Sequence, residues 1–166
     1  MSNNIAWTEH FDKDLLRGEN YEYIVLHKLQ KIFPSAFKVK GSFKEYDIFV
    51  PDCIHCEKEF GIEVKYDHKS NTTGNILIEL EFPIGKPTGL NTTKAEYWVI
   101  TDGKDYVCNT PKNIVIYAKE NNVQARPIIG EGDAEAKLVW LLPKEDFFEY
   151  CELQKSKLRK IRWWTN

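Results

Sequence analysis

Hydrophobic residues recur at helical spacing between residues 12 and 33. The apolar positions are Leu15, Leu16, Tyr23, Ile24, Leu26, Leu29, Ile32 and Phe33. Apolar side chains that repeat every three or four residues form one face of an α-helix, and a proline ends such a pattern. Because Pro34 follows directly, the pattern predicts a first helix over residues 12–33.

Four short runs after this helix are rich in β-branched and aromatic residues and alternate in part between apolar and polar positions. They lie at residues 37–40, 46–50, 60–66 and 75–82. Such runs are typical of β-strands. The polar segment 51–59 begins with Pro-Asp, which favours a turn. We therefore expect a hairpin here, with the strands on either side of it paired.

The second half of the chain alternates between strand-like and helix-like segments. The expected elements are a turn or brief helix at 92–96, strands at 97–101, 106–108 and 138–142, and helices at 111–121 and 143–154. Asp102-Gly103 suits a tight turn, and Thr110 before Pro111 suits a helix N-terminus. Helices interleaved with mostly adjacent strands predict an α/β fold, in which helices flank one central mixed β-sheet.

Length and composition fit one domain. With 166 residues, of which 42% are hydrophobic, the chain can build one compact core. We expect a single domain over residues 1–154, followed by a basic, tryptophan-containing tail over residues 155–166. The formal net charge of −2 excludes the strongly basic average of a protein that coats nucleic acid, although a local basic patch is compatible with it.

Targeting and redox signals are weak. The N-terminus has no basic stretch followed by an apolar run, and no segment has the length needed to cross a bilayer. We therefore expect no membrane partner and a cytoplasmic protein, or one in the host cytoplasm if the chain is phage-encoded. The four cysteines are too few and too scattered for a disulfide framework, so reduced thiols are expected.

The tripeptide Glu63-Val64-Lys65 is the first candidate for chemistry, because it lies inside an apolar strand. Alternation along a strand places Glu63 and Lys65 on the same face. A Glu-x-Lys pattern occurs about once by chance in a chain of this length. The second copy, Glu135-Ala136-Lys137, begins in a polar loop, where solvated charges are ordinary.

A second carboxylate, Asp47, lies in the preceding strand, and the hairpin folds it back beside Glu63. Two carboxylates and a carbonyl can hold Mg²⁺, which polarises a scissile phosphate and lowers the pKa of a bound water. Lys65 would position or deprotonate that water and offset negative charge in the transition state. Asp52 is an alternative acid, although Pro-Asp is common in turns. The alternative for the whole cluster is a buried salt bridge between sheet faces.

These motifs resemble the PD-(D/E)XK nuclease superfamily. Tyr-Asp-Ile-Phe-Val at residues 46–50, Gly-Ile-Glu-Val-Lys at residues 61–65 and a first helix with Glu22, Val25 and Leu29 carry the resemblance, which covers roughly residues 18–66. The resemblance implies a restriction-endonuclease-like core. It also implies Mg²⁺ or Mn²⁺ held by Asp47, Glu63 and the backbone carbonyl of Val64, with Lys65 in catalysis. Glu22 fits the place of an auxiliary acid at a second metal better than Glu19.

Residues 75–81, 85–90 and 92–95 are similar to small phage and Holliday-junction-resolvase-like members of that superfamily. The similarity implies that Thr93 and Lys94 contact nucleic acid. Glu79 and Glu81 share one strand face, and one of them would lie near the metal or a phosphate. The alternative is a solvated sheet face and loop.

The C-terminal tail combines positive charge with indole rings. Its basic and aromatic candidates for binding nucleic acid are Lys157, Arg159, Lys160, Arg162 and Trp163. Phosphate attraction plus stacking grips single-stranded or distorted nucleic acid. Alternatively, the tryptophans cover the core or a dimer interface.

Two smaller features remain. Cys53 and Cys56 resemble half of a zinc site, but a chance pair is the favoured interpretation because a structural site needs four ligands. His10, His27 and His68 are expected at the surface, with His68 near the substrate.

The sequence thus predicts a metal-dependent nuclease that hydrolyses phosphodiester bonds in DNA, with RNA as an alternative substrate. A structure-selective, resolvase-like endonuclease is favoured by the resemblance and by the absence of an accessory domain. A homodimer would supply one active site for each strand. The rival predictions are a catalytically inactive, nuclease-fold module that binds nucleic acid, and a phage-type interaction protein.

Overall fold

The computed structural model describes residues 4–41, 45–51, 58–130 and 132–157, with side chains described from residue 16 to residue 155 within these ranges. The helices are α1 (Asn4–Gln30), α2 (Ser70–Thr73), α3 (Pro111–Glu120) and α4 (Lys144–Lys157), with a short 3₁₀ helix, η1 (Gly89–Asn91). The strands are β1 (Phe37–Lys38), β2 (Ile48–Val50), β3 (Phe60–Tyr66), β4 (Asn75–Glu81), β5 (Tyr97–Thr101), β6 (Tyr106–Asn109), β7 (Arg126–Ile128) and β8 (Lys137–Pro143).

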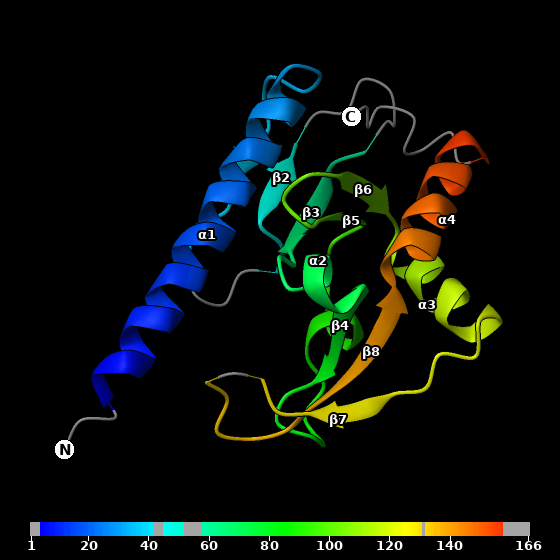
Figure 1. The fold of residues 1–166 in the computed structure, drawn as a ribbon. Helices are drawn as coiled ribbons and strands as arrows, with labels where there is room; N and C mark the ends of the chain where they lie inside the picture. Colours follow the sequence, from blue (N-terminus) through cyan, green and yellow to red (C-terminus); the bar gives the residue numbers. More distant parts are fainter. Residues whose placement is uncertain (1–3, 42–44, 52–57, 131, 158–166) are drawn as a thin grey trace.

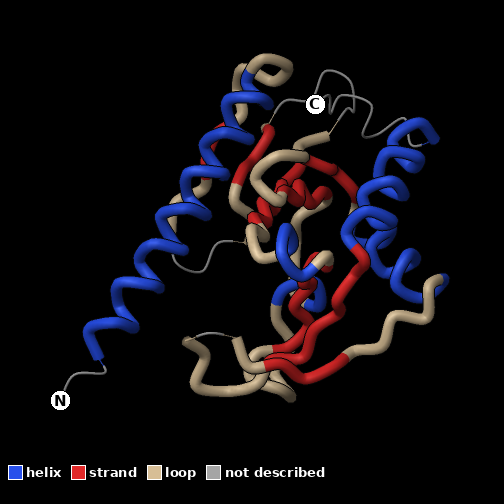
Figure 2. Tube along the Cα trace, viewed as in Figure 1, coloured by secondary structure: helices blue, strands red, loops and turns tan. Residues whose placement is uncertain are grey.

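The strands form two sheets (Figures 1 and 2). The large sheet has the order β1-β2-β3-β5-β6, and the small sheet has the order β4-β8-β7. In the large sheet β3 and β5 run parallel and the other neighbours run antiparallel, so it is mixed. The α/β class and the mixed sheet are therefore confirmed. The expectation of one sheet is wrong, because β4 pairs with the distant β8 instead of joining its sequence neighbours.

Helix α1 covers one face of the large sheet (Figure 1). Val25 and Leu29 of the helix are fully buried against Ile48, Ile62 and Val99 of the strands. Each such side chain contributes about 1.5–3 kcal/mol through burial. The helix begins before the predicted residue 12 and ends at Gln30, and the chain then turns through two backbone bonds to the Leu29 carbonyl.

The opposite face of the large sheet packs against the small sheet, α3 and α4. Strand β5 is buried at all five positions, because both of its faces are covered. Its side chains at Trp98 and Ile100 belong to this second hydrophobic cluster. The other large side chains that fill it are Ile76, Ile78, Ile114, Leu142 and Phe147.

Several local predictions are confirmed. Strands β2 and β3 pair antiparallel as the expected hairpin. The Thr110 hydroxyl accepts a hydrogen bond from the Asn113 amide at 3.2 Å, with Pro111 at the first helical position of α3. The turn or helix expected at 92–96 is wrong, because the helical turn is η1, three residues earlier. Strand β7 and helix α2 were not predicted.

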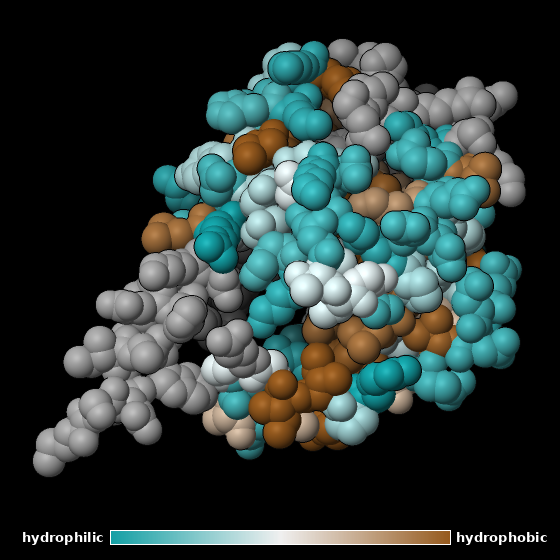
Figure 3. Space-filling model, viewed as in Figure 1, coloured by the Kyte–Doolittle hydropathy of each residue, from teal (hydrophilic) through white to brown (hydrophobic). Residues whose placement is uncertain are grey.

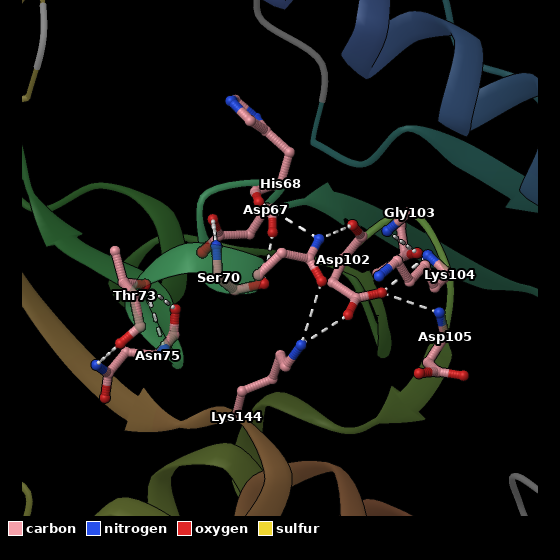
Figure 4. A network of polar contacts seen from close by, with 12 residues as sticks. Asp67, His68, Ser70, Thr73, Asn75, Asp102, Gly103, Lys104, Asp105 and Lys144 are labelled. Carbon is pink, nitrogen blue, oxygen red and sulfur yellow. Dashed lines mark hydrogen bonds and ion pairs between the residues drawn. The ribbon is translucent and has the colours of Figure 1, made fainter.

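A polar network ties α2, the β5–β6 turn and the start of α4 together (Figure 4). The Lys144 ammonium lies 2.9 Å from the buried Asp102 carboxylate, and Asn71 donates to the Asp102 carbonyl at 2.7 Å. Burial by itself raises the pKa of Asp102, but the amides of Asp105 and Lys104 and the charge of Lys144 outweigh it and hold the pKa below its usual range. Asp102 therefore takes part as an ionised carboxylate, and in this form the network stabilises the contact between the two sheets.

Hydrophobic residues gather on the lower part of the face drawn in Figure 3, over the small sheet, and the upper part is mostly hydrophilic. Ile84 and Ile129 are 48% and 70% exposed. Within the described part of the chain, no helix has the length and apolar character needed to cross a membrane.

Candidate active site

A cavity of about 440 Å³ lies where β3 ends, between α1 and β4. Its lining includes the two predicted catalytic residues of β3, Glu63 and Lys65, together with His68 of the following loop and Glu79 of β4. In α/β folds, ligands bind beyond the carboxyl ends of the parallel strands. Strand β3 runs parallel to β5, so the cavity lies where such a fold places a ligand.

Strand pairing brings Asp47 beside the same segment. Ile48 pairs with Ile62 at the end of the ladder, and Asp47 directly precedes Ile48, next to the start of the Glu63-Val64-Lys65 segment. The Asp47 amide donates to the Ile62 carbonyl at 2.9 Å, and its side-chain Oδ2 accepts from the Val64 amide at 2.7 Å. Asp47 is buried, at 5% exposed, and does not line the cavity itself. Asp47 therefore lies at the strand edge behind Glu63.

The carbonyl of Val64 is directed to this edge as well. Within a strand, the N–H and the C=O of one residue point to the same side. Because the Val64 N–H points to Asp47, its C=O does so too. The Asp47 carboxylate and the Val64 carbonyl oxygen thus lie on the β2 side of β3, and the neighbouring Glu63 lines the cavity.

This donor set is small for a metal site. Among the described residues, no group of three or more His, Cys, Asp or Glu side chains is arranged to hold a metal ion. Mg²⁺ is commonly bound by only one or two carboxylates and keeps several waters. The oxygen-only set of Asp47, Glu63 and Val64 fits such an ion, with water and substrate oxygens completing its coordination.

The position of Asp47 depends on a close approach between Tyr46 and Gly61. The Tyr46 ring stacks on Phe49 with centroids 5.4 Å apart and crosses over Gly61. A Cβ at Gly61 would lie 2.5 Å from Cγ of that ring, which is closer than carbon atoms approach. Glycine at this position lets the residue before Asp47 pack flat on the sheet.

Glu22 does not reach the cavity. Its carboxylate forms an ion pair with Lys38 of β1 at 2.8 Å, and both side chains are largely buried. Glu19 lies 3.7 Å from the same ammonium and is half exposed. Glu22 thus pairs with Lys38 of the edge strand β1, on the α1 side of the sheet. The geometry therefore gives no support to the expected place of Glu22 at a second metal.

Of the two acids expected on β4, Glu79 lines the cavity and Glu81 does not. Glu79 accepts from the Thr88 hydroxyl at 2.7 Å and lies 3.6 Å from Lys137. Lys137 of the second Glu-x-Lys pattern is 18% exposed and pairs with Asp133 at 2.8 Å, so it is less solvated than expected.

The loop residue Thr93 has an internal partner. Its hydroxyl accepts from the indole N–H of Trp98 at 3.1 Å and from the Ala95 amide at 3.2 Å. Trp98 is 3% exposed and forms part of the cavity lining. Lys94 is exposed. Thr93 thus orients a ring behind the cavity, a role that the sequence did not predict.

Some predicted residues lie outside the described part of the chain. They are Asp52, Cys53, Cys56, Arg159, Lys160, Arg162 and Trp163, together with the side chain of Lys157.

The loop after β3 is fixed by Asp67. One carboxylate oxygen accepts from the Ser70 amide at 3.2 Å, and the other accepts from the Leu77 amide at 2.9 Å. These bonds join the end of β3 to the start of β4 and hold the intervening His68 and Lys69 at the cavity. Aspartate commonly bonds the amides that follow it in turns, and this is the only local signal in the sequence for the arrangement.

No family model, curated protein or solved structure matches this chain. Its function is therefore inferred from the residues themselves.

Proposed function

We propose that this protein is a metal-dependent nuclease that hydrolyses phosphodiester bonds in DNA and that its large sheet belongs to a restriction-endonuclease-like core. One observation carries the proposal: the buried Asp47 side chain accepts a hydrogen bond from the Val64 amide at 2.7 Å, which holds it against the Glu63-Val64-Lys65 segment. Lys65 lies on the same strand face as Glu63 and lines the same cavity.

The donor atoms support a hard divalent cation. Asp47, Glu63 and the carbonyl of Val64 are all oxygen ligands, which suit Mg²⁺ or Mn²⁺ better than softer metals. Neighbouring carboxylates repel each other, and burial adds to the cost of their charge. A bound cation offsets that cost, polarises a phosphate oxygen and lowers the pKa of a bound water.

Lys65 is the protein's own contribution to the reaction. Its ammonium would lie beside the attacked phosphate, where it orients the incoming water and offsets the charge that develops in the transition state. Because Lys65 and Glu63 stand two residues apart on a paired strand, their spacing is fixed by the sheet.

The favoured subclass is a structure-selective endonuclease of the resolvase-like kind. The cavity is the size of a site for a small ligand, which suits one nucleotide. A homodimer would supply a second site for the opposite strand.

The proposal is tested by incubating the purified protein with linear duplex, single-stranded and four-way-junction DNA, with and without Mg²⁺ or Mn²⁺, and resolving the products on a denaturing gel. Wild type is expected to cut only with metal. Lys65→Met and Asp47→Asn should each lose cleavage while keeping the far-ultraviolet circular dichroism of the wild type. Lys112→Met, which removes an exposed lysine of α3 outside the cavity, is the matched control and should cut normally.

A folded wild type that cuts none of the substrates would contradict the proposal. If that protein binds nucleic acid equally well with and without metal, the chain is instead a binding module that uses a nuclease-like fold.

A further inference from the structure

A row of aromatic rings runs from α1 to the cavity. Tyr21 of α1 stacks on Tyr66 at the end of β3, with ring centroids 4.0 Å apart and planes 23° apart. On one side, Tyr106 lies 6.4 Å from Tyr21, with the Lys28 ammonium 4.3 Å from its centroid. On the other side, His68 lies 5.6 Å from Tyr66 with planes 33° apart. The row therefore ends at His68.

These rings differ from the aromatic pairs of the core. Phe33 and Phe60 meet edge to face at 85°, as buried rings commonly do. Tyr21 and Tyr66 are nearly parallel, and all four rings of the row are partly exposed. In Figure 4 the His68 ring points away from the polar network that surrounds Asp67. His68 is tilted by 33° against Tyr66 of the stacked pair, and its outward-pointing ring offers a face that another flat ring can cover.

We propose that His68 stacks an unpaired nucleobase of the substrate, while the phosphate of that nucleotide lies over Lys65 in the same cavity. This inference rests on the nuclease activity proposed above and names its substrate class: a single-stranded or locally unpaired segment of nucleic acid. A paired base is enclosed in the duplex stack and has to leave it before a side chain can cover its face.

The dimensions of the cavity agree with one nucleotide. Its volume of about 440 Å³ lies within the roughly 300–1,000 Å³ of sites for small ligands. Gly18 of α1 forms part of the wall, and a Cβ built there meets no atom within 4 Å. The wall on this side of the cavity is therefore open.

The charges of the cavity favour one orientation of the nucleotide. Lys65 and Lys69 line it from β3 and the following loop, on the same side as His68, together with Glu63, the proposed metal ligand, and Asp67, whose carboxylate accepts from two backbone amides. Glu79 lies on the opposite strand, β4, where a phosphate would be repelled. The base and its phosphate are therefore expected along the Lys65–His68 side.

The inference is tested with a short DNA oligonucleotide that carries the fluorescent base 2-aminopurine, used single-stranded, as a duplex and as the RNA of the same sequence. Binding is measured in EDTA, so that cleavage does not interfere. We expect tighter binding of the single strand than of the duplex, together with quenching of the fluorescent base by stacking.

Variants separate stacking from general attraction. His68→Ala should weaken binding of the single strand by roughly 5- to 150-fold, which corresponds to the loss of one stacked base. His68→Phe keeps a flat ring and should restore binding to within a few-fold of wild type. Tyr23→Ala is the control, because Tyr23 is a 50% exposed tyrosine of the same helix outside the row.

Equal affinity for single strand and duplex, or wild-type affinity in His68→Ala, would overturn the inference. Tighter binding of RNA than of DNA, with the same loss in His68→Ala, would support base stacking and assign it to RNA. The cleavage assay keeps the two proposals separate. Metal-dependent cleavage without any preference for unpaired DNA would support the nuclease activity and contradict the stacking on His68. Quenching without cleavage would support the stacking and contradict the nuclease activity.

Discussion

The same substitution should have opposite effects at two glycines. At Gly61, an added methyl group would lie 2.5 Å from Cγ and 2.9 Å from Cε1 of the Tyr46 ring. That ring is held by its stacking on Phe49, so it cannot move away without loss. At Gly18, inside α1, an added methyl group meets nothing within 4 Å. Gly61→Ala is therefore an overpacking change, and Gly18→Ala removes only backbone freedom.

The magnitudes follow from these contacts. Overpacking by one methyl group in a well-packed region costs about 1–3 kcal/mol. Glycine inside a helix is less stable than alanine by about 0.5–1 kcal/mol, so Gly18→Ala should raise the free energy of unfolding by that amount. For a chain of this size, 1 kcal/mol shifts Tm by roughly 2–4 °C. The two variants should differ in Tm by several degrees, on opposite sides of wild type.

Urea unfolding followed by circular dichroism measures both changes. The double variant Gly61→Ala, Tyr46→Leu provides the check, because it removes the ring that the methyl group meets. The loss of unfolding free energy in the double variant should be smaller than the sum of the losses in Gly61→Ala and Tyr46→Leu. Wild-type stability in Gly61→Ala, or strict additivity in the double variant, would refute the assigned contact between Gly61 and Tyr46.

Two further predictions concern buried groups. Lys144→Met should lower the free energy of unfolding by about 2 kcal/mol at pH 7, because it removes a charged hydrogen bond to the buried Asp102. Since the pKa of folded Asp102 is lower than its unfolded value, its contribution is complete above the unfolded pKa and is lost as pH falls through the folded one. Urea midpoints between pH 7 and pH 3 should therefore fall more steeply in wild type than in Asp102→Asn, and equal slopes would count against this role. Burial raises the pKa of Cys151 to about 12 and that of Cys108 above its usual range. In a variant with serine at the other two cysteines, a thiol reagent at pH 8 should label both only after unfolding, and rapid labelling of the folded protein would show that they are accessible.

The strands of the large sheet could be predicted because their patterns are strong. Strand β5 is apolar at nearly every position, and β2 and β3 flank a short turn-like segment. The small sheet could not be predicted as a separate unit. Alternation in β4 identifies its buried face but not its partner, and that partner, β8, follows after three intervening strands. Strand β7 has Pro127 at its centre and two exposed residues, so it carries no strand pattern.

The candidate site shows the same division. The positions of Glu63 and Lys65 follow from alternation along one strand, and that of Asp47 follows from the register of a hairpin. Glu22 was predicted less well, because its direction depends on how α1 packs and on a lysine of β1. The sequence predicts His68 at the surface and near the substrate, but its place in a row of rings depends on Tyr21, which lies far away in the sequence.

The cavity is bounded by strands that belong to different sheets. Glu63 and Lys65 stand on β3 of the large sheet, and Leu77 and Glu79 face them from β4 of the small sheet. A substitution at Leu77 would therefore change the shape of the space available to a ligand while leaving the hydrogen bonds between β2 and β3 intact. Under the proposed chemistry, substitutions on the small sheet would change the substrate preference, while the hydrolytic groups on the large sheet stay unchanged. This makes Leu77 the position at which we would begin to re-engineer selectivity.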